Sequence, residues 1–407
     1  MADSARSAKK RLSDLEPASL AGRTVLVRAD FNVPLEDGEV VDDQRIRASL
    51  PTVRLLTEAG ARVVLLSHLG RPKGKPNPAM SLAPVARRLG ALLDTEVHFV
   101  PEPSGPPAAE AIGAMTDGDV ILLENTRFLA GDAANDRELA EAWAGLGDLF
   151  VNDAFGAAHR AHASTSGLAE AVVRRGGEAV AGLLLEEELR YLADALDEPK
   201  RPFVAVLGGA KISGKIDVIS ALLPKVDRLL IGGAMANTFF RAQGLETGAS
   251  LVEEDRIELA DELMNQAADK LVLPLDCVVA AEIEEGAATR TVSRTAIGER
   301  DRVIDIGPET RALFIDVLKG ARTIVWNGPM GVFEIDAFAE GTIEIARAVA
   351  EACDRGALGV IGGGDSGAAA ERAGVVDRIS HISTGGGASL DLLAGAELPG
   401  VASLTDA

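Results

Sequence analysis

Residues 203–223 read FVAVLGGAKISGKIDVISALL, and this stretch decides the fold. Its first part, FVAVLG (203–208), is a short apolar run, and its last part, 215–223, has the apolar spacing of a helix. A near-continuous run of Val, Leu and Ala is typical of a strand buried on both faces, as in a parallel sheet covered by helices. The stretch therefore predicts a strand–turn–helix unit of an α/β domain.

The same alternation of strand and helix patterns continues on both sides of this stretch. Amphipathic segments such as 44–59 and 341–353 separate the apolar runs, which indicates parallel sheets with helices on both faces. The segment LLLEEELRYLADALDEPKRP predicts a helix near 180–200 that is closed by Pro199 and connects two α/β domains. Further strands are expected at 23–28, 62–67, 96–100, 119–124, 149–152, 228–232, 271–274, 302–307, 323–328 and 358–363.

The composition excludes several classes of protein. The chain has 407 residues, 47% hydrophobic and 25% charged, which suits two or three globular domains. Its 62 acidic and 41 basic residues give a net charge of −21, which argues against binding to nucleic acid or anionic membranes. Cys277 and Cys353 are too few for a disulfide framework, and no 18-residue apolar stretch or signal-peptide core is found. We therefore expect a cytoplasmic protein with no nucleic-acid or membrane partner.

Glycine-rich turns follow the expected strands in the C-terminal half. Glycine lets backbone N–H groups approach phosphate oxygens, and the positive end of a following helix adds to the attraction. One such turn is weak support, whereas four in one domain favour a phosphate or nucleotide site. The four turns are LGGAK (207–211), IGGAM (231–235), IGGGDS (361–366) and STGGGAS (383–389).

Three familiar motifs nearly match these turns. GAKISGKI (209–216) has the spacing of a Walker A loop, but Ile216 offers no hydroxyl for Mg²⁺, so we reject that assignment. Lys211 and Lys215 remain as candidate phosphate ligands, although a solvated lysine pair has the same pattern. GGGDSG (362–367) fits the dinucleotide pattern only formally. GDSG alone does not make a serine protease, because this chain is α/β and lacks the His/Asp pair.

Asp365 has two possible roles. A carboxylate in a glycine-rich turn at a strand end is a natural Mg²⁺ ligand beside a phosphate site. Aspartate also caps helix N-termini well, and a helix is expected at 366–373. The residue types leave both roles open.

Basic side chains follow the expected strands of the N-terminal half. In a parallel sheet these turns meet at one edge, where ligands of α/β proteins bind. Arginine suits such a site because its planar fork binds carboxylate and phosphate with two hydrogen bonds. Any single arginine is also compatible with a solvated surface position. We expect one small polyanion to be surrounded by Arg28, Arg45, Arg71, Arg127, Arg160 and His68.

The chain resembles the phosphoglycerate kinase family over essentially its whole length. The resemblance rests on RADFNVP, SHLGRP, LLENTRF, VNDAFGAAHRAHAS, LGGAKISGKI, VWNGPMGVFE, GGGDS and HISTGGGAS, in family order. It implies two Rossmann-like, doubly wound parallel-sheet domains joined by a helix and hinge. The expected ranges are 1–182 for the phosphoglycerate-binding domain, 183–200 for the connecting helix, 201–390 for the nucleotide-binding domain and 391–407 for a tail that returns to the first domain.

The resemblance also implies the reaction and its ligands. The family transfers a phosphoryl group reversibly between 1,3-bisphosphoglycerate and ADP, giving 3-phosphoglycerate and ATP, in glycolysis and gluconeogenesis, with Mg²⁺ and as a monomer. Matching phosphoglycerate positions are Asp30, Asn32, Arg45, His68, Arg71, Arg127 and Arg160, with Arg28 close by. Matching Mg-ATP/ADP positions are Gly209, Ala210, Lys211, Lys215, Asn327, Glu334 for the ribose, Gly363, Gly364, Asp365 as the Mg²⁺ ligand, and Ser366.

Catalytic roles follow from the chemistry of the reaction. The nucleophile in the ATP-consuming direction is a carboxylate, which is already ionised at pH 7, so no general base is needed. We expect the transferred group to be stabilised by Arg45, Lys211, Mg²⁺ and the backbone around Gly386 and Gly387. Because the two ligands belong to different domains, we expect the domains to close during the reaction.

Two small departures and two rival functions remain. Ala234 stands where the family often has a third glycine, and Ser366 stands where threonine is also common; neither puts the activity in doubt.

Without the resemblance, GGGDSG in an α/β chain would favour a nicotinamide-dependent dehydrogenase. A non-enzymatic anion- or nucleotide-binding protein is the other alternative.

Overall fold

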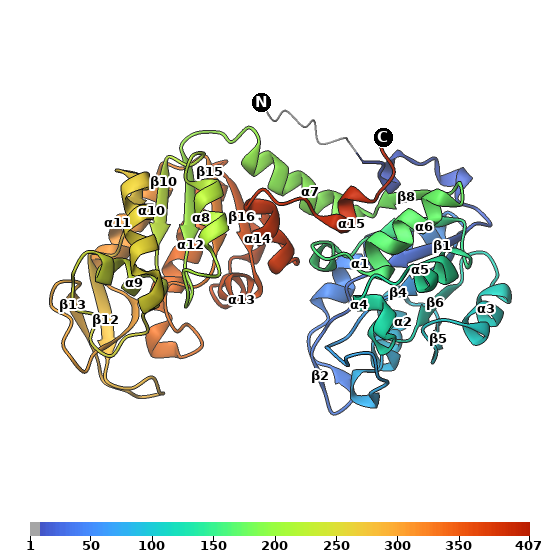
Figure 1. Ribbon diagram of the computed structural model, residues 1–407, viewed down its shortest axis with the longest axis horizontal. Coiled ribbons are helices and arrows are strands. Elements are labelled where there is room, and N and C mark those ends of the chain that lie inside the picture. Colours follow the sequence, from blue (N-terminus) through green and yellow to red (C-terminus); the bar gives the residue numbers. More distant parts are fainter. Residues whose placement is uncertain (1–8) are drawn as a thin grey trace. The chain divides into compact units, whose positions relative to one another are not determined.

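The structure is a computed structural model that describes residues 9–407. Two compact units are present: unit 1 comprises the described residues up to Leu189 together with Glu397–Ala407, and unit 2 comprises Arg190–Ala396. Each unit contains a six-stranded sheet with helices along it (Figure 1). The expected fold class, two doubly wound α/β domains, is confirmed. In the described part of the chain, no helix is both long and apolar enough to cross a membrane.

The sheet of unit 1 is parallel throughout, in the order β5-β6-β4-β1-β7-β8. Strands β1, β4, β6 and β7 are fully or almost fully buried, as their unbroken apolar runs predict. The edge strand β8 had no predicted counterpart. The strand bounds are β1 (Thr24–Arg28), β4 (Arg62–Leu66), β5 (Val97–Val100), β6 (Val120–Leu123), β7 (Leu149–Asn152) and β8 (Glu178–Ala181).

Helices cover both faces of this sheet because the chain moves toward one edge from β1 to β4 and toward the other edge from β7 to β8. Since both connections are right-handed, they must lie on opposite faces. Helices α1 (Gln44–Glu58) and α2 (Ala83–Leu93) pack on the face that carries Val25 and Val27. Helices α5 (Arg137–Ala144) and α6 (Leu168–Arg174) pack together along the other face. The remaining elements are β2 (Leu35–Glu36), β3 (Glu39–Val40), α3 (Pro106–Gly113) and α4 (Ala130–Ala133).

Unit 2 repeats the scheme with the order β11-β10-β9-β15-β16-β17, again parallel. Trp326 and Val206 point into a core that helices α11, α12 and α13 cover. The strands are β9 (Phe203–Leu207), β10 (Arg228–Ile231), β11 (Leu271–Val272), β15 (Thr323–Asn327), β16 (Leu358–Gly362) and β17 (His381–Ile382). The helices are α8 (Ile216–Leu222), α9 (Met235–Ala242), α10 (Ile257–Ala267), α11 (Pro308–Lys319), α12 (Glu340–Asp354), α13 (Gly364–Arg372) and α14 (Gly387–Leu393).

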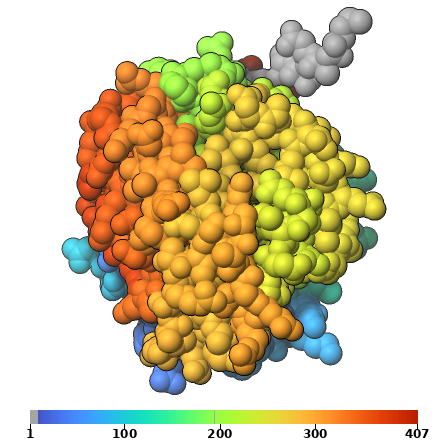
Figure 2. Space-filling model, turned by 90° about the vertical axis from the view of Figure 1, so that its left-hand side faces the viewer, coloured from blue at the N-terminus to red at the C-terminus, as the bar shows by residue number. Residues whose placement is uncertain are grey.

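One predicted strand belongs to a different sheet from its neighbours in the sequence. The run at 302–307 forms β14 (Arg302–Ile306), which pairs antiparallel with β12 (Asp276–Ala280). Strand β13 (Thr289–Ser293) pairs with the other side of β12, and neither β12 nor β13 was predicted. A short run such as RVIDI, with three apolar residues in five, does not specify its partner strand, so the sequence pattern alone could not separate this small sheet from the parallel one. Residues of this region, orange in Figure 2, form much of the face of unit 2 in that view.

Two segments link the units along the chain. Helix α7 (Leu183–Leu196) contains the point where the chain passes from unit 1 to unit 2, and it ends three residues before Pro199. After α14, the chain re-enters unit 1 and forms α15 (Pro399–Ala402). There the side-chain amide of Asn152 donates to the Gly400 carbonyl at 2.8 Å, and the Thr405 N–H donates to the Ala179 carbonyl at 2.9 Å.

Candidate functional site

The carboxyl edge of the unit 1 sheet carries the predicted basic residues. Arg28 is the last residue of β1, and Asp30 and Asn32 follow it at alternating positions. His68 follows β4, and Arg127 lies in a 3₁₀ turn, Thr126–Phe128, after β6. Because all six strands are parallel, these turns meet at one edge, as the sequence predicts.

Arg28 is completely buried, and its guanidinium is hydrogen-bonded within the protein. Its Nε donates to the Ser164 hydroxyl at 3.0 Å, Nη1 donates to the Ala29 carbonyl, and Nη2 donates to Nδ1 of His68 at 3.0 Å. The expectation that Arg28 would surround an anion with the other arginines must be revised, because its guanidinium is buried and bonded to three protein groups. A sequence shows that a strand ends in arginine but not how deep that arginine lies.

His68 is neutral at physiological pH, so it adds no charge to the edge. Burial lowers the pKa of His68 well below its usual value, and the charges of Arg28 and Arg127 lower it further. Since arginine only donates hydrogen bonds, Nδ1 of His68 accepts from Arg28 and the proton sits on Nε2. Burial likewise lowers the pKa of the neighbouring His162 to about 4. The edge therefore offers one neutral N–H donor where a sixth cation was expected.

Arg45 is tied to the polar residues that follow β1. From the first turn of α1, its Nη1 donates to the Asp30 carboxylate at 3.3 Å and to the Asn32 carbonyl at 3.2 Å. The Asn32 side-chain oxygen in turn accepts from the Gly70 N–H at 2.8 Å. The Arg45 side chain remains about one third exposed, so part of its guanidinium is open to a ligand.

Three further arginines lie near enough for the charges of two of them to lower the pKa of the third. We call this group the arginine cluster: Arg71, Arg127 and Arg160. Burial lowers the pKa of Arg127, and the positive charges of Arg160 and Arg71 lower it further. Arg71 and Arg160 are exposed, whereas Arg127 is half-buried and donates to the Gly70 carbonyl at 3.4 Å. Like charges that lower one another's pKa in this way favour the binding of an anion among them.

The carboxyl edge of the unit 2 sheet is built from backbone in direct contact. A Cβ on Gly208 would lie 2.0 Å from the Pro329 carbonyl oxygen, and one on Gly233 would lie 2.4 Å from the Gly209 nitrogen. Gly233 also has a positive φ of 68°, which glycine adopts without strain. By contrast, the Ala234 backbone is right-handed, with φ −64°, so alanine fits at that departure from the family pattern.

Lys215 and Asn327 meet at this edge. The Lys215 ammonium donates to the Asn327 side-chain oxygen, and the Asn327 amide donates to the Gly362 carbonyl at 2.7 Å. Burial lowers the pKa of Lys215 to about 8, and the Asp365 carboxylate opposes that shift. Asn327, Lys215 and Asp365 are thus brought together from three separate turns.

The GGGDS turn leads directly into helix α13. Gly363 caps the helix through its backbone, Gly364 is the first helical residue, and Asp365 lies exposed in the first turn. Asp365 does not occupy the N-cap position, which removes the capping role that the sequence left open. The Ser366 hydroxyl is buried and accepts from the Gly328 N–H at 2.7 Å. Ser366 therefore supports the neighbouring turn of β15.

The remaining predicted residues of unit 2 lie in loops of the same edge. Lys211 is exposed, and its charge lowers the pKa of Glu253 together with bonds from Ser213, against the opposing effect of burial. Glu334 is exposed beside Phe333, whose carbonyl accepts from Arg372 of α13. Gly386 precedes α14, and Gly387 is its first residue.

Several residues of these edges were missed by the sequence reasoning. In unit 1, the Ser164 hydroxyl accepts from Nε of Arg28, and the charge of Asp132 opposes the lowering of the Arg127 pKa by burial. In unit 2, Glu253 accepts from the Ser213 N–H at 3.1 Å in the loop that carries Lys211. Ser164 closes the stretch VNDAFGAAHRAHAS but was not singled out there, and Asp132 and Glu253 lie outside the quoted motifs. Only their position in space shows what they contact.

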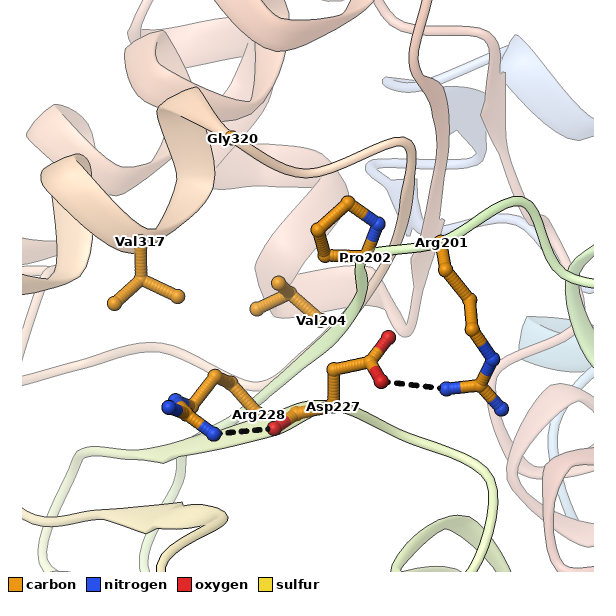
Figure 3. Close-up of a pocket in the computed structure, with 7 residues that line it drawn as sticks. All are labelled: Arg201, Pro202, Val204, Asp227, Arg228, Val317 and Gly320. Carbon is orange, nitrogen blue, oxygen red and sulfur yellow. Dashed lines mark hydrogen bonds and ion pairs between the residues drawn. The ribbon is translucent and has the colours of Figure 1, made fainter.

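A separate pocket lies at the opposite edge of the unit 2 sheet (Figure 3). Its volume is about 500 Å³, and its charged groups are paired with the protein. Arg201 donates to the Asp227 carboxylate at 2.6 Å, and Arg228 donates to the Asp227 carbonyl at 2.9 Å. The pocket is at the amino ends of β9 and β10, away from the glycine-rich turns. Its lining residues are Arg201, Pro202, Val204, Asp227, Arg228, Val317 and Gly320.

Comparison with known proteins gives a consistent result. A family model described as "Phosphoglycerate kinase" matches residues 13–396. The phosphoglycerate kinase of Rubrobacter xylanophilus is 57% identical over 398 residues, which cover 98% of each chain. That of Chlorobium limicola is 55% identical over 402 residues, 98% of this chain and all of the other.

Solved structures agree with the sequence matches. The structure of phosphoglycerate kinase from Coxiella burnetii superposes with a TM-score of 0.86 at 42% identity, covering 97% of this chain and 98% of the other. The crystal structure of the enzyme from Pyrococcus horikoshii gives a TM-score of 0.84 at 34% identity with the same coverage. The resemblance first suggested by the motifs is confirmed, and the chain belongs to the phosphoglycerate kinase family.

Proposed function

We propose that the chain carries out its family's reaction with phosphoglycerate on unit 1 and nucleotide on unit 2. The chain is a kinase of glycolysis that transfers a phosphoryl group between 1,3-bisphosphoglycerate and ADP. The observation that carries the proposal is the pair of contrasting edges: arginine side chains in unit 1, and glycine backbone with two lysines in unit 2.

Phosphoglycerate binding is proposed for the carboxyl edge of unit 1. The arginine cluster and Arg45 supply positive charge, while His68, Asp30 and Asn32 supply a neutral donor and acceptors. The substrate has a phosphate and a carboxylate at its two ends, and arginine binds both groups with paired hydrogen bonds. The single hydroxyl group between those ends would form hydrogen bonds with Asp30 and Asn32.

Nucleotide binding is proposed for the carboxyl edge of unit 2. Lys211 and Lys215 would hold phosphates, and the glycine turns at 208–210 and 363–364 would let the backbone approach them. Asn327 would keep the Lys215 ammonium in place, and Glu334 would bond the ribose hydroxyls. Ser366 would act through the Gly328 turn that it supports.

The residues present fit a Mg²⁺ ion brought in with the nucleotide. Within residues 9–407 no group of three or more His, Cys, Asp or Glu side chains is arranged to hold a metal. Asp365 is an exposed carboxylate whose charge reaches Lys215, so it lies at the proposed phosphate site. One carboxylate together with nucleotide phosphates is a common environment for Mg²⁺. When bound, the ion would neutralise charge on the phosphate oxygens.

The chain's own residues would act by positioning and charge. The acceptor carboxylate is ionised at pH 7, so neither His68 nor His162 needs to remove a proton, and both are neutral. Arg45 and Lys211 would stabilise the negative charge that spreads over the transferred group. The backbone N–H groups at Gly386 and Gly387 would add hydrogen bonds to that group.

The proposal further includes closure of the two units during the reaction, a monomeric enzyme and a cytoplasmic location.

A coupled assay tests the proposal directly. Purified protein with 3-phosphoglycerate and Mg-ATP should form 1,3-bisphosphoglycerate, which a linked dehydrogenase detects as NADH oxidation. Omitting either substrate should abolish the signal. Fluorescence titration separates the rivals: Mg-ADP should bind, whereas NADH binding without turnover would favour a dehydrogenase. Binding of both family ligands with no turnover would identify a non-enzymatic binding protein.

A further inference from the structure

Asp132 is a buried carboxylate beside the arginine cluster. It lies in α4, five residues after Arg127, and none of its surface is exposed to solvent. A buried charge is costly unless hydrogen bonds and an opposite charge compensate it. Asp132 therefore needs a structural reason for its position.

Both carboxylate oxygens of Asp132 are occupied. Oδ2 accepts from the Thr126 hydroxyl at 2.7 Å, and Oδ1 accepts from the Ser164 N–H at 3.0 Å. Thr126 directly precedes Arg127 in the 3₁₀ turn. Ser164 lies four residues after Arg160. The carboxylate thus joins the two segments that carry two members of the arginine cluster.

The connection continues to the end of β1. The Ser164 hydroxyl accepts from Nε of Arg28 at 3.0 Å, and Arg28 in turn donates to His68. Asp132, Ser164, Arg28 and His68 form one continuous hydrogen-bonded chain. It fixes three separate turns of the carboxyl edge relative to one another.

The charge of Asp132 also matters to the arginines. Burial lowers the pKa of Arg127 and of Arg28, and the Asp132 carboxylate opposes that effect for both. For Asp132 itself, burial raises the pKa, but Arg28 and the bonds from Thr126 and Ser164 outweigh it, so the pKa is lowered overall. The carboxylate is therefore ionised at neutral pH and offsets the mutual repulsion of the arginines.

We propose that Asp132 is a positioning residue for phosphoglycerate: it holds the Arg127 turn and the Arg160 segment together and keeps their arginines in place before the anion arrives. The inference rests on the proposed placement of phosphoglycerate in unit 1. Asp132 does not touch the substrate. It acts through Thr126, Ser164 and the arginines that they carry or contact.

Steady-state kinetics of Asp132→Asn test this role. The amide matches the carboxylate in shape, its oxygen can still accept from the Ser164 N–H, and the Thr126 hydroxyl can turn to accept from its NH₂ group, so the substitution removes the charge while both contacts can be kept. We expect the KM for 3-phosphoglycerate to rise about ten-fold or more, the size expected when hydrogen bonds to a charged acceptor are replaced by weaker bonds to a neutral group. The KM for Mg-ATP and kcat should change by less than about three-fold. A purely structural role would lower the melting temperature without separating the two KM values, and that result would overturn the inference.

A decrease in the KM for 3-phosphoglycerate would be equally informative. If the carboxylate merely repelled the anionic substrate, its removal would lower the KM for 3-phosphoglycerate. Asp136→Asn is the matched control, because it removes an exposed carboxylate four residues away that caps α5. That variant should leave both KM values unchanged. An equal rise in the control would show that the effect is not specific to Asp132.

A second variant keeps the test decisive if Asp132→Asn does not fold. Thr126→Val removes the hydroxyl bond at 2.7 Å and leaves the charge and the Ser164 bond intact. It should raise the KM for 3-phosphoglycerate by roughly three-fold, with the KM for Mg-ATP unchanged. An unchanged KM for both substrates in Thr126→Val would contradict the role of the carboxylate in holding the Arg127 turn.

Arg127→Ala separates this inference from the proposed function. If Arg127→Ala raises the KM for 3-phosphoglycerate and neither Asp132→Asn nor Thr126→Val does, only the inference fails. If none of the three variants changes that KM, the proposed placement of phosphoglycerate on unit 1 fails as well.

Discussion

The ammonium of Lys215 is hydrogen-bonded to the side-chain oxygen of Asn327, which is itself oriented by its bond to the Gly362 carbonyl. This arrangement keeps a lysine in a partly buried position where its charge is costly, and the pKa of Lys215 falls to about 8. A lysine that titrates so close to neutral pH gives nucleotide binding a measurable pH dependence.

Affinity for Mg-ADP should decrease as the pH rises through the pKa of Lys215. At pH 9, about one unit above that pKa, roughly one tenth of the lysine is protonated, so affinity should be up to about ten-fold weaker than at pH 7.5. Nucleotide phosphates are already ionised in this range. Calorimetry in two buffers of different ionisation enthalpy should show proton uptake near pH 8. Lys215→Arg, which stays charged, should bind with a flat profile; a falling profile there would assign the effect to another group.

Turnover should depend strongly on Arg45 and Lys211. Arg45→Ala and Lys211→Ala should each lower kcat by about 10²–10³-fold, with smaller changes in KM, because their charge is needed most in the transition state. Arg54→Ala on the exposed face of α1 and Lys319→Ala at the end of α11 are matched controls and should retain activity. Near-normal turnover in either test variant would remove that residue from the mechanism.

Metal dependence should depend on Asp365. Asp365→Asn should raise the Mg²⁺ concentration needed for half-maximal activity by about ten-fold or more, because the amide is a much weaker ligand for a hard cation. Asp377→Asn, which changes another exposed carboxylate a short distance along the chain, serves as the control. Equal Mg²⁺ requirements in the two variants would exclude Asp365 as the ligand.

Two histidines of unit 1 should not titrate near neutral pH. His162 has a pKa of about 4, and His68 has a pKa well below its usual value, because burial and nearby arginines disfavour the charged rings. In an NMR titration from pH 5.5 to 8, the ring signals of these two residues should stay constant. Their assignment follows from His68→Gln and His162→Gln. A midpoint near 6.5 for either residue would mean that its ring is more exposed to solvent than in this structure.

The start of helix α7 should make unit 1 sensitive to pH. Asp153 caps this helix, accepting from the Leu184 and Leu185 N–H groups at 2.9 and 3.3 Å. Burial raises its pKa from 3.8 to about 6, so the folded state binds the proton more tightly than the unfolded state. This contribution to stability is present at low pH and is lost as the pH rises from about 4 to 6.

Asp153→Asn removes that loss while keeping a capping oxygen. The free energy of unfolding of the variant, relative to wild type, should therefore increase between pH 4 and pH 6, by roughly 3 kcal/mol at most. Urea titration followed by Trp143 fluorescence in a Trp326→Phe background measures unit 1, because the chain has only these two tryptophans. A constant difference across this pH range would show that Asp153 keeps an ordinary pKa.

The sequence predicted the positions of the strands better than it predicted which strands pair with one another. Strands such as 23–28 and 323–328 formed almost where expected, because each has three consecutive apolar residues, Val25–Val27 and Ile324–Trp326, which suit a short strand buried on both faces. The run at 302–307 had the same appearance but joined an antiparallel sheet. Partner choice depends on contacts far along the chain, which a local pattern does not contain.

The same limit applies to the candidate site. Residue types and turns placed Asp30, His68 and Arg127 at one edge, because strand ends in a parallel sheet meet there. The sequence did not show how deeply each side chain is buried or whether it is charged: Arg28 is buried and His68 is neutral. Asp132 and Glu253 escaped notice because a carboxylate that supports other residues has no motif of its own.

The return of the chain to unit 1 has a consequence for biosynthesis. Residues 397–407 belong to unit 1, where Thr405 bonds to both Ala179 and Lys10. They are translated only after the whole of unit 2 has been synthesised. Unit 1 must therefore wait in an incomplete state, with part of its surface uncovered, while the later unit is made and folds. The enzyme's first domain to emerge is thus the last to be finished.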